Sequence, residues 1–489
     1  MKNKIIGICL CLAILAASVA LSVSVDPDKE RIHQHFAAVV APECTDHGSE
    51  KFCTHLPLVQ INTAGQEIPG KAVRQDGETI YTTTPDGSDT ITARFTVTDH
   101  TEIRNHTDDE PEIDTSALIH VRGHSSRHFD KSSYKIKLVT EDGKSNLQSV
   151  MGMPAHSEWV LHGPFLDKTL LRNYMFYNLA GEMMDYAPNV RFCEVMLNGS
   201  YEGVYVMTES IDAGEDGARL PLSVSRKDET YTGYLLKLDR RAEEDIDNFS
   251  RYSLRMDDAL GIIVEFPSES KLTPELKKDI ASDFSDFEKA IYSYDFDSRE
   301  FGYRQLIDVD SFVDYFLINE LTCNYDAGSL STYIYKQPDN KFRMCVWDFN
   351  NACDNYQEAL TPNDGFQLND DLWYWVLIKD EDFSQQIVDR YYSLRNDLFS
   401  DEYIDSYIDG VIAYLGDAVD RNYERWGYTF DHDKGLLLPS YRNPHSYDEA
   451  VAQLKTFLHQ RASFMDRNIE SLKQYSAQSK TKKYIENAN

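Results

Sequence analysis

Alternating apolar and polar positions mark the first half of the chain as rich in β-strands. Segments 56–65, 90–99 and 116–126 are short apolar runs separated by Gly, Asp and Pro turns. This pattern is typical of strands joined by tight turns. In segment 132–139, "SSYKIKLV", apolar residues alternate with lysines, so we expect a half-buried strand that carries lysines on its open face.

Helical spacing first appears in segment 167–184, for which Asp167 is the predicted N-cap. Two apolar runs then flank Asn198 and Gly199, a dipeptide that strongly indicates a β-hairpin. We therefore expect a sheet with one helix packed on it over residues 55–240.

Helices dominate the pattern after about residue 300. Segment 308–323 predicts a helix capped by Asp310 or Ser311. A loop, a strand, a turn at 338–340 and a second strand that ends at Asp348 follow, and amphipathic helices fill the rest. The fold class that these patterns predict is α+β.

An apolar run from Ile5 to Val25 follows Lys2 and Lys4, which is the charge and length of an export signal. Small residues near its end suit a signal peptidase, but the run is also long enough to span a bilayer uncut. We expect export, with cleavage or anchoring left open. Any membrane attachment would be through this segment.

The predicted organisation has five regions. They are a signal peptide or N-terminal membrane anchor at 1–25, a linker at 26–54, a β-rich N-terminal lobe at 55–240, a mainly helical C-terminal lobe with an embedded hairpin at 241–472, and a polar tail at 473–489.

The chain is strongly acidic, with a formal net charge of -32 at pH 7. Such a charge argues against nonspecific binding to nucleic acid or to an anionic membrane, and it would attract a basic protein.

Cysteine spacing gives a local disulfide as one expectation. Cys44 and Cys53 are close enough in sequence to pair in an oxidising compartment, whereas the four later cysteines lie in segments typical of a core. The chain has no CxxC and no Cys/His group with the spacing of a metal site, so a zinc site is not expected.

Two aspartates flank the predicted hairpin of the second half. Asp326 precedes its first strand and Asp348 follows its second, so the hairpin would bring the two carboxylates together. Close carboxylates repel each other unless a cation lies between them or one is protonated, and Mg²⁺ with substrate phosphates is a natural partner. The alternative is that Asp326 caps a turn and Asp348 caps a helix.

Basic and polar residues in the first half favour the metal–phosphate interpretation. The turn "RGHSSR" at 122–127 could present backbone N–H groups and hydroxyls to an anion, and Lys131, Lys135 and Lys137 follow it. Such lysines are otherwise simply solvated. The order of parts matches that of a protein kinase, but GxGxxG, HRD and DFG are missing, which excludes an ordinary kinase and leaves an atypical one.

Four motifs together resemble the CotH family of atypical, kinase-like proteins first known from bacterial spore coats. They are "VRGHSSRHFDKSSYKIKL", "WVLHGPFLDKTLLRNYMFYNLA", "VMLNGSYEGVYVMTESID" and "NYDAGSLSTYIYK…VWDFNNA", in the family's order between about residues 56 and 425. The resemblance implies an atypical bilobal protein-kinase-like fold and a bacterial protein, secreted or at the cell surface. It also implies ATP and Mg²⁺ as cofactors, and Ser/Thr phosphorylation of an exported protein substrate, possibly basic and Ser-rich.

The resemblance also implies roles for single residues. Asp348 corresponds to the metal-binding aspartate, with Ser331 as a further metal ligand, and Asp326 corresponds to the aspartate that orients or deprotonates the acceptor hydroxyl. Lys137 and Lys131 match the family's two lysines, of which we favour Lys137 for the phosphates.

The remaining matches concern the nucleotide. Arg122, Gly123, Ser125 and Ser126 match the turn that covers it. Glu209 falls where kinases pass from one lobe to the other, as either a hinge residue or a lysine partner.

Three positions depart from the family pattern. His124 replaces an Asn in the turn, Ser331 lies in a segment that commonly carries a metal-holding Asn, and Asn350 replaces an Asp. A non-catalytic extracellular scaffold or binding protein on the same fold is therefore the alternative to a kinase, and transfer of AMP is a third possibility.

Overall fold

The computed structural model describes residues 31–37, 44, 52–100, 102–211, 213–214, 219–222, 233–337, 341–431 and 436–477. The chain divides into two compact units, 1–37 and 38–489. The first contains the short helix α2 (Gln34–Ala37), and the other described elements belong to the second. The predicted leader at 1–25 lies outside the described residues.

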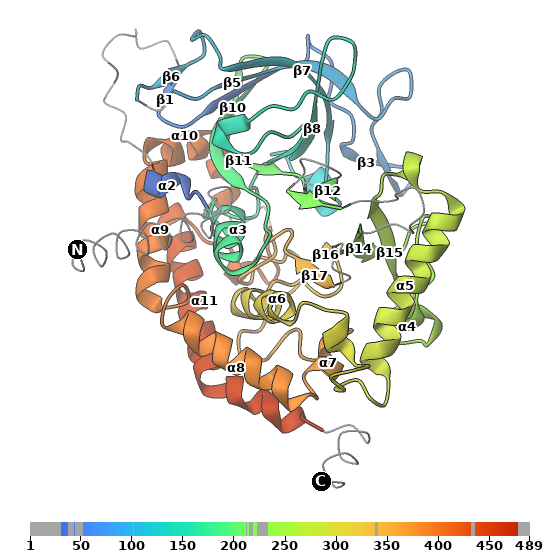
Figure 1. The fold of residues 1–489 in the computed structure, drawn as a ribbon. Helices are drawn as coiled ribbons and strands as arrows, with labels where there is room; N and C mark the ends of the chain where they lie inside the picture. Colours follow the sequence, from blue (N-terminus) through green and yellow to red (C-terminus); the bar gives the residue numbers. More distant parts are fainter. Residues whose placement is uncertain are drawn as a thin grey trace, which may run out of the picture. The chain divides into compact units, whose positions relative to one another are not determined.

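Seven strands close into a barrel (Figure 1). In barrel order they are β10 (Val190–Leu197), β11 (Ser200–Glu209), β9 (Glu158–His162), β8 (Tyr134–Val139), β7 (Ile113–Val121), β5 (Ile91–Thr98) and β2 (Leu58–Asn62). Alternate side chains fill the interior, among them Phe95, Ile136 and Trp159, because successive strand residues point to opposite faces. Closure leaves these strands no free edge.

The hairpin predicted at Asn198 and Gly199 is confirmed. β10 pairs with β11 in antiparallel fashion on either side of this dipeptide. Asn198 has φ 50° and Gly199 φ 79°, the left-handed conformation that a two-residue hairpin turn requires.

A second sheet has the order β15-β14-β16-β17. It consists of β14 (Tyr234–Arg240), β15 (Leu260–Phe266), β16 (Thr332–Lys336) and β17 (Phe342–Cys345). The β16–β17 hairpin is confirmed, although its predicted turn at 338–340 lies outside the described residues. β14 lies at the end of the predicted N-terminal lobe (55–240) yet pairs with β16, so this strand links the first half of the chain to the sheet of the second.

Helices follow in the C-terminal part, and the fold is a mixed α+β fold (Figure 1). The helices are α3 (Arg172–Met183), α4 (Phe249–Tyr252), α5 (Pro274–Tyr292), α6 (Val309–Thr322), α7 (Tyr374–Leu377), α8 (Glu381–Arg395), α9 (Asp401–Leu415), α10 (Asp417–Trp426) and α11 (Tyr447–Asn468). Short strands are β1 (Cys53–Thr54), β3 (Ala72–Gln75), β4 (Glu78–Tyr81), β6 (Asn105–His106), β12 (Ala213–Gly214) and β13 (Leu220–Pro221). One apolar core fills the barrel, and a larger one surrounds α3 and α6.

Two predicted helix starts are wrong. α6 is capped by Asp308, whose extended backbone lets its carboxylate accept a hydrogen bond from Ser311 N at 3.2 Å, so neither Asp310 nor Ser311 is the cap. α3 begins at Arg172, five residues after Asp167, although the Asp167 carboxylate still accepts from Arg172 N at 2.9 Å.

The described parts of the predicted linker and of the predicted polar tail contain regular secondary structure. β1 lies within the predicted linker and pairs with β6. Near the C-terminus a 3₁₀ helix runs over Ile469–Tyr475, and Ala477 N donates to Lys379 O at 2.8 Å. In the part of the chain that the structure describes, no helix is both long and apolar enough to cross a membrane.

Candidate active site

The backbone of Asp348 is fixed from two sides. This residue follows β17 and has φ 58°, a left-handed conformation that Asp tolerates better than most residues. Its N–H donates to the Tyr177 hydroxyl of α3 at 2.9 Å, and its carbonyl accepts from Asn324 Nδ2, just after α6, at 3.2 Å. Two helices therefore set the position of this carboxylate.

The first turn of α3 holds the loop after Asp348. Asn173 accepts from Phe349 N at 2.9 Å, and the Asn173 amide donates to Asn350 Oδ1 at 3.1 Å. Arg172 donates to two further loop carbonyls, those of Ala352 (2.8 Å) and Cys353 (3.1 Å). The predicted helix thus has a second function, which is to anchor the aspartate loop.

Asp326 lies in the loop between α6 and β16. Burial and the negative charge of Asp348 raise the pKa of Asp326 to about 6. Asn351 Nδ2 donates to Asp326 Oδ2 at 2.7 Å and favours the charged form. The structure therefore brings Asp326 and Asp348 into electrostatic contact at the two ends of the β16–β17 hairpin.

The two carboxylates suit a hard divalent cation. Among the described residues, the Asp348 carboxylate accepts one hydrogen bond, from Asn350 N at 3.2 Å, and that of Asp326 accepts the one from Asn351. Lone pairs thus remain on both groups, and their mutual repulsion is what a cation relieves. Ser331 has φ 48°, and among the described residues the hydrogen bonds to the two carboxylates come from Asn350 and Asn351, not from Ser331.

Arg122 reaches the surroundings of Asp348. Its guanidinium carbon lies 6.0 Å from the centre of the Trp347 ring, and its charge acts on both His162 and Tyr177. The negative charge of Asp348 also influences the pKa values of His162 and Tyr177, so the Arg122 guanidinium and the Asp348 carboxylate are both near these two side chains. Burial lowers the pKa of His162 to about 4, which keeps this imidazole neutral near pH 7.

The turn after Arg122 is compact. Gly123 has φ 107°, a conformation that other residues adopt only with strain, and a Cβ there would lie 1.8 Å from Ser126 Oγ, which would have to shift. Ser126 donates to Arg122 O at 3.3 Å, and Ser125 is exposed.

The end of β14 connects this turn to the acidic pair. Asp239 and Arg240 influence the pKa of His124 in the turn and also that of Asp326. The turn and the Asp326 loop therefore share neighbours.

Lys137 forms an ion pair on the outer face of the barrel. Glu158 of β9 binds both Lys137 and Lys135, each at 3.1 Å. Burial opposes the charge of Glu158, but the two ammonium groups lower its pKa overall. Glu158 and His162 are on the same face of β9, four residues or about 13 Å apart. Lys137 pairs with Glu158 and Lys135 pairs with Val160, so Lys135 is two residues closer to His162 along the strand.

Lys131 and Glu209 are each held by partners of their own, and the charge of Lys131 acts on His162, as does that of Asp348. Lys131 is 1% exposed and donates to Val204 O (2.7 Å) and Asn422 Oδ1 of α10 (2.8 Å). Burial lowers the Lys131 pKa well below its usual value. Glu209 is buried, its ion pair among the described residues is with Arg219, and it also accepts from Asn189 Nδ2 at 2.9 Å.

Several residues of this region carried no signal in the sequence. Glu158 and His162 lie on a strand whose other residues are apolar. Asn351 and Tyr177 take part in the site only through contacts with distant segments of the chain. The only indication in the sequence was that Glu158 and His162 are polar residues at alternate positions of an otherwise apolar strand.

The fold and this site define an α+β protein with a paired-aspartate site on a hairpin. A model of the CotH kinase protein family matches residues 119–465. Since this match covers most of the chain, the chain belongs to that family. Comparison with curated proteins gives no match.

Proposed function

We propose that the protein is an exported, atypical protein kinase that transfers the γ-phosphate of ATP to Ser or Thr of secreted or surface proteins. The observation that carries the proposal is that the charge of Asp348 acts on Asp326 and helps to raise its pKa, and that each carboxylate accepts only one hydrogen bond among the described residues. Membership of the CotH kinase family supports it, as does a β-rich region followed by helices, which suits a bilobal kinase-like arrangement.

In this proposal each residue has a defined task. Mg-ATP supplies the transferable phosphoryl group and a cation that neutralises its charge. Asp348 holds the metal, and Asp326 orients the acceptor hydroxyl or takes its proton. Arg122 and its turn cover the phosphates, with Lys137 or its neighbour Lys135 as a further positive charge from the barrel.

Asp348→Ala tests the proposal. Purified protein with labelled Mg-ATP and basic Ser-rich peptides should transfer the γ-phosphate, and the variant should lose about 1,000-fold or more, because removing one transition-state contact already costs about 100- to 1,000-fold. Asp364→Ala is the matched control, since Asp364 is exposed and outside the site. Equal transfer by the Asp348 variant would refute the assignment.

A non-catalytic scaffold is the second candidate. The observation in its favour is that Asn351, and not a further carboxylate, contacts Asp326, and that Asn350 occupies the place of an aspartate. Absence of Mg-ATP binding at millimolar concentration would favour the scaffold. Mass spectrometry of a modified product would distinguish phosphate from AMP.

A further inference from the structure

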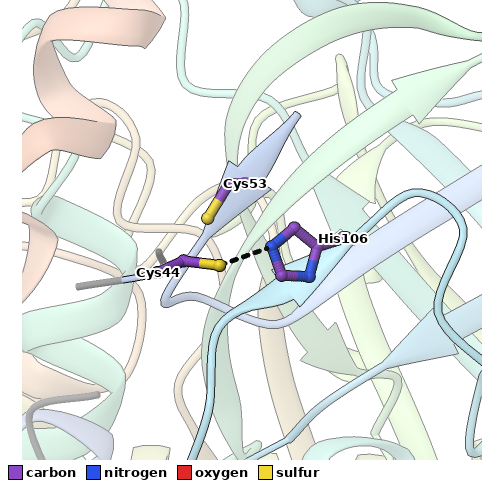
Figure 2. A group of neighbouring side chains, drawn as sticks. All are labelled: Cys44, Cys53 and His106. Carbon is purple, nitrogen blue, oxygen red and sulfur yellow. Dashed lines mark hydrogen bonds between the residues drawn. The ribbon is translucent and has the colours of Figure 1, made fainter. Parts of the chain in front are cut away.

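Two cysteines and a histidine converge at the β1–β6 pair (Figure 2). The ligand atoms of Cys44, Cys53 and His106 all lie within 4.8 Å of one another, and His106 Nε2 is 3.3 Å from Cys44 Sγ. Cys53 and His106 are direct partners in the β1–β6 pair, so the backbone itself sets two of the three groups side by side.

A carboxylate orients the histidine. Asp109 Oδ2 lies 3.1 Å from His106 Nδ1 and also accepts from the His106 backbone N–H at 2.8 Å. With Nδ1 occupied, Nε2 is the nitrogen directed at the sulfur atoms. A histidine held in this way by a carboxylate is the usual outer shell of a protein metal site.

We propose that Cys44, Cys53 and His106 bind one Zn²⁺ ion, with water in the fourth position. Tetrahedral Zn²⁺ with Zn–S about 2.3 Å and Zn–N about 2.0–2.1 Å places sulfur and nitrogen about 3.6 Å apart and the two sulfurs about 3.8 Å apart. Both separations fit the observed cluster. Two thiolates and an imidazole favour Zn²⁺ over Mg²⁺ or Ca²⁺.

The charges of the site also balance. Binding displaces one proton from each thiol, and the two thiolates then neutralise the ion. Burial raises the pKa of the Cys53 thiol overall, and Arg104 Nη1, 4.0 Å from Cys53 Sγ, acts in the opposite direction; the charge of Arg104 is in turn offset by Asp417, 3.4 Å away on α10.

The expected role of the ion is structural. It would fasten the segment at Cys44 to the β1–β6 pair, beside the contact of Arg104 with α10. A Cys44–Cys53 disulfide is the competing state. Both thiols are free in the structure, and a disulfide would leave the orientation of His106 toward them without a function.

Metal analysis of the intact chain tests the proposal. Protein purified under reducing conditions and dialysed against Zn²⁺ should retain one equivalent, and a chelator should lower its melting temperature. Replacement by Co²⁺ should give the absorption of cobalt–thiolate bonds. Cys53→Ser and His106→Ala should lose the metal, whereas His445→Ala, an exposed histidine outside the cluster, should retain it.

Asp109→Asn separates metal binding from folding, since it leaves all three ligands in place. It should weaken Zn²⁺ affinity about 10-fold or more. The proposal is overturned if reduced wild-type protein retains no Zn²⁺, if the protein as isolated contains a Cys44–Cys53 disulfide that persists in the presence of Zn²⁺, or if His106→Ala binds as tightly as wild type.

Discussion

At the scale of single residues, the candidate site depends on one buried carboxylate whose pKa is raised. Asp326 is buried next to Asp348, and both effects raise its pKa to about 6 from an ordinary 3.8. In the folded protein without a cation, Asp326 therefore binds its proton more tightly than in the unfolded chain. A divalent cation between the carboxylates would reverse this preference.

The stability of metal-free protein should consequently depend on pH. Because the folded pKa is raised, the stabilisation from the bound proton is full below about pH 4 and is lost as the pH rises to about 6. Urea unfolding across this window should show a smaller fall in Asp326→Asn than in wild type and in Asp364→Asn, because other buried carboxylates such as Asp371 titrate in all three proteins. An unchanged slope in Asp326→Asn would mean that Asp326 titrates normally.

At the scale of elements, α3 acts as a clamp on the aspartate loop. Arg172, Asn173 and Tyr177 all bind backbone or side-chain groups between Asp348 and Cys353. A loop held at several points is a suitable support for a site that must keep its geometry.

Tyr177→Phe should reveal how much this clamp contributes. The variant leaves the Asp348 N–H without its acceptor, at a cost of about 1–3 kcal/mol in the free energy of unfolding, and it should slow phosphate transfer. Unfolding and transfer assays of this variant beside Tyr252→Phe, an exposed tyrosine, provide the measurement. If both variants equal wild type in both assays, the hydrogen bond does not position Asp348.

Elements with local signals were predictable from the sequence. The two hairpins and the body of α6 follow from turn residues and from apolar spacing over short segments. The closure of the barrel was not, because it depends on the parallel pairing of β2 with β10, which lie far apart in the chain.

The same division holds for the candidate site: parts that depend on local sequence were predictable, and parts that depend on contacts between distant segments were not. The approach of Asp326 and Asp348 follows from a hairpin between them, whereas the burial of Lys131 depends on Asn422 of α10, almost 300 residues away. The Cys44, Cys53 and His106 cluster escaped notice because strand pairing, and not sequence spacing, assembles it.

At the scale of the whole molecule, a buried ion pair joins α6, which precedes the Asp326 loop, to α11. Glu320 of α6 and Arg461 of α11 are both 0% exposed and are 2.5 Å apart, and Glu320 also accepts from Leu368 N at 2.6 Å. Since α6 leads directly into the Asp326 loop, this ion pair fixes the helix from which the loop begins.

Arg461→Ala should destabilise the protein by about 3–5 kcal/mol, because it leaves the Glu320 carboxylate buried without its counter-charge. Arg467→Ala on the exposed face of the same helix should stay within about 0.5 kcal/mol of wild type. Denaturant unfolding provides both values. A loss below about 1 kcal/mol for Arg461→Ala would show that the pair is not needed.

The central claim, that Asp326 and Asp348 hold a cation with a nucleotide, is tested most directly by calorimetric titration with Mg-ATP. Wild type should bind with a dissociation constant of about 1 mM or tighter, in the usual range for an enzyme substrate. Asp348→Ala should lose this binding, and Asp364→Ala should keep it. Absence of binding by wild type at millimolar nucleotide, or equal binding by Asp348→Ala, would contradict the account.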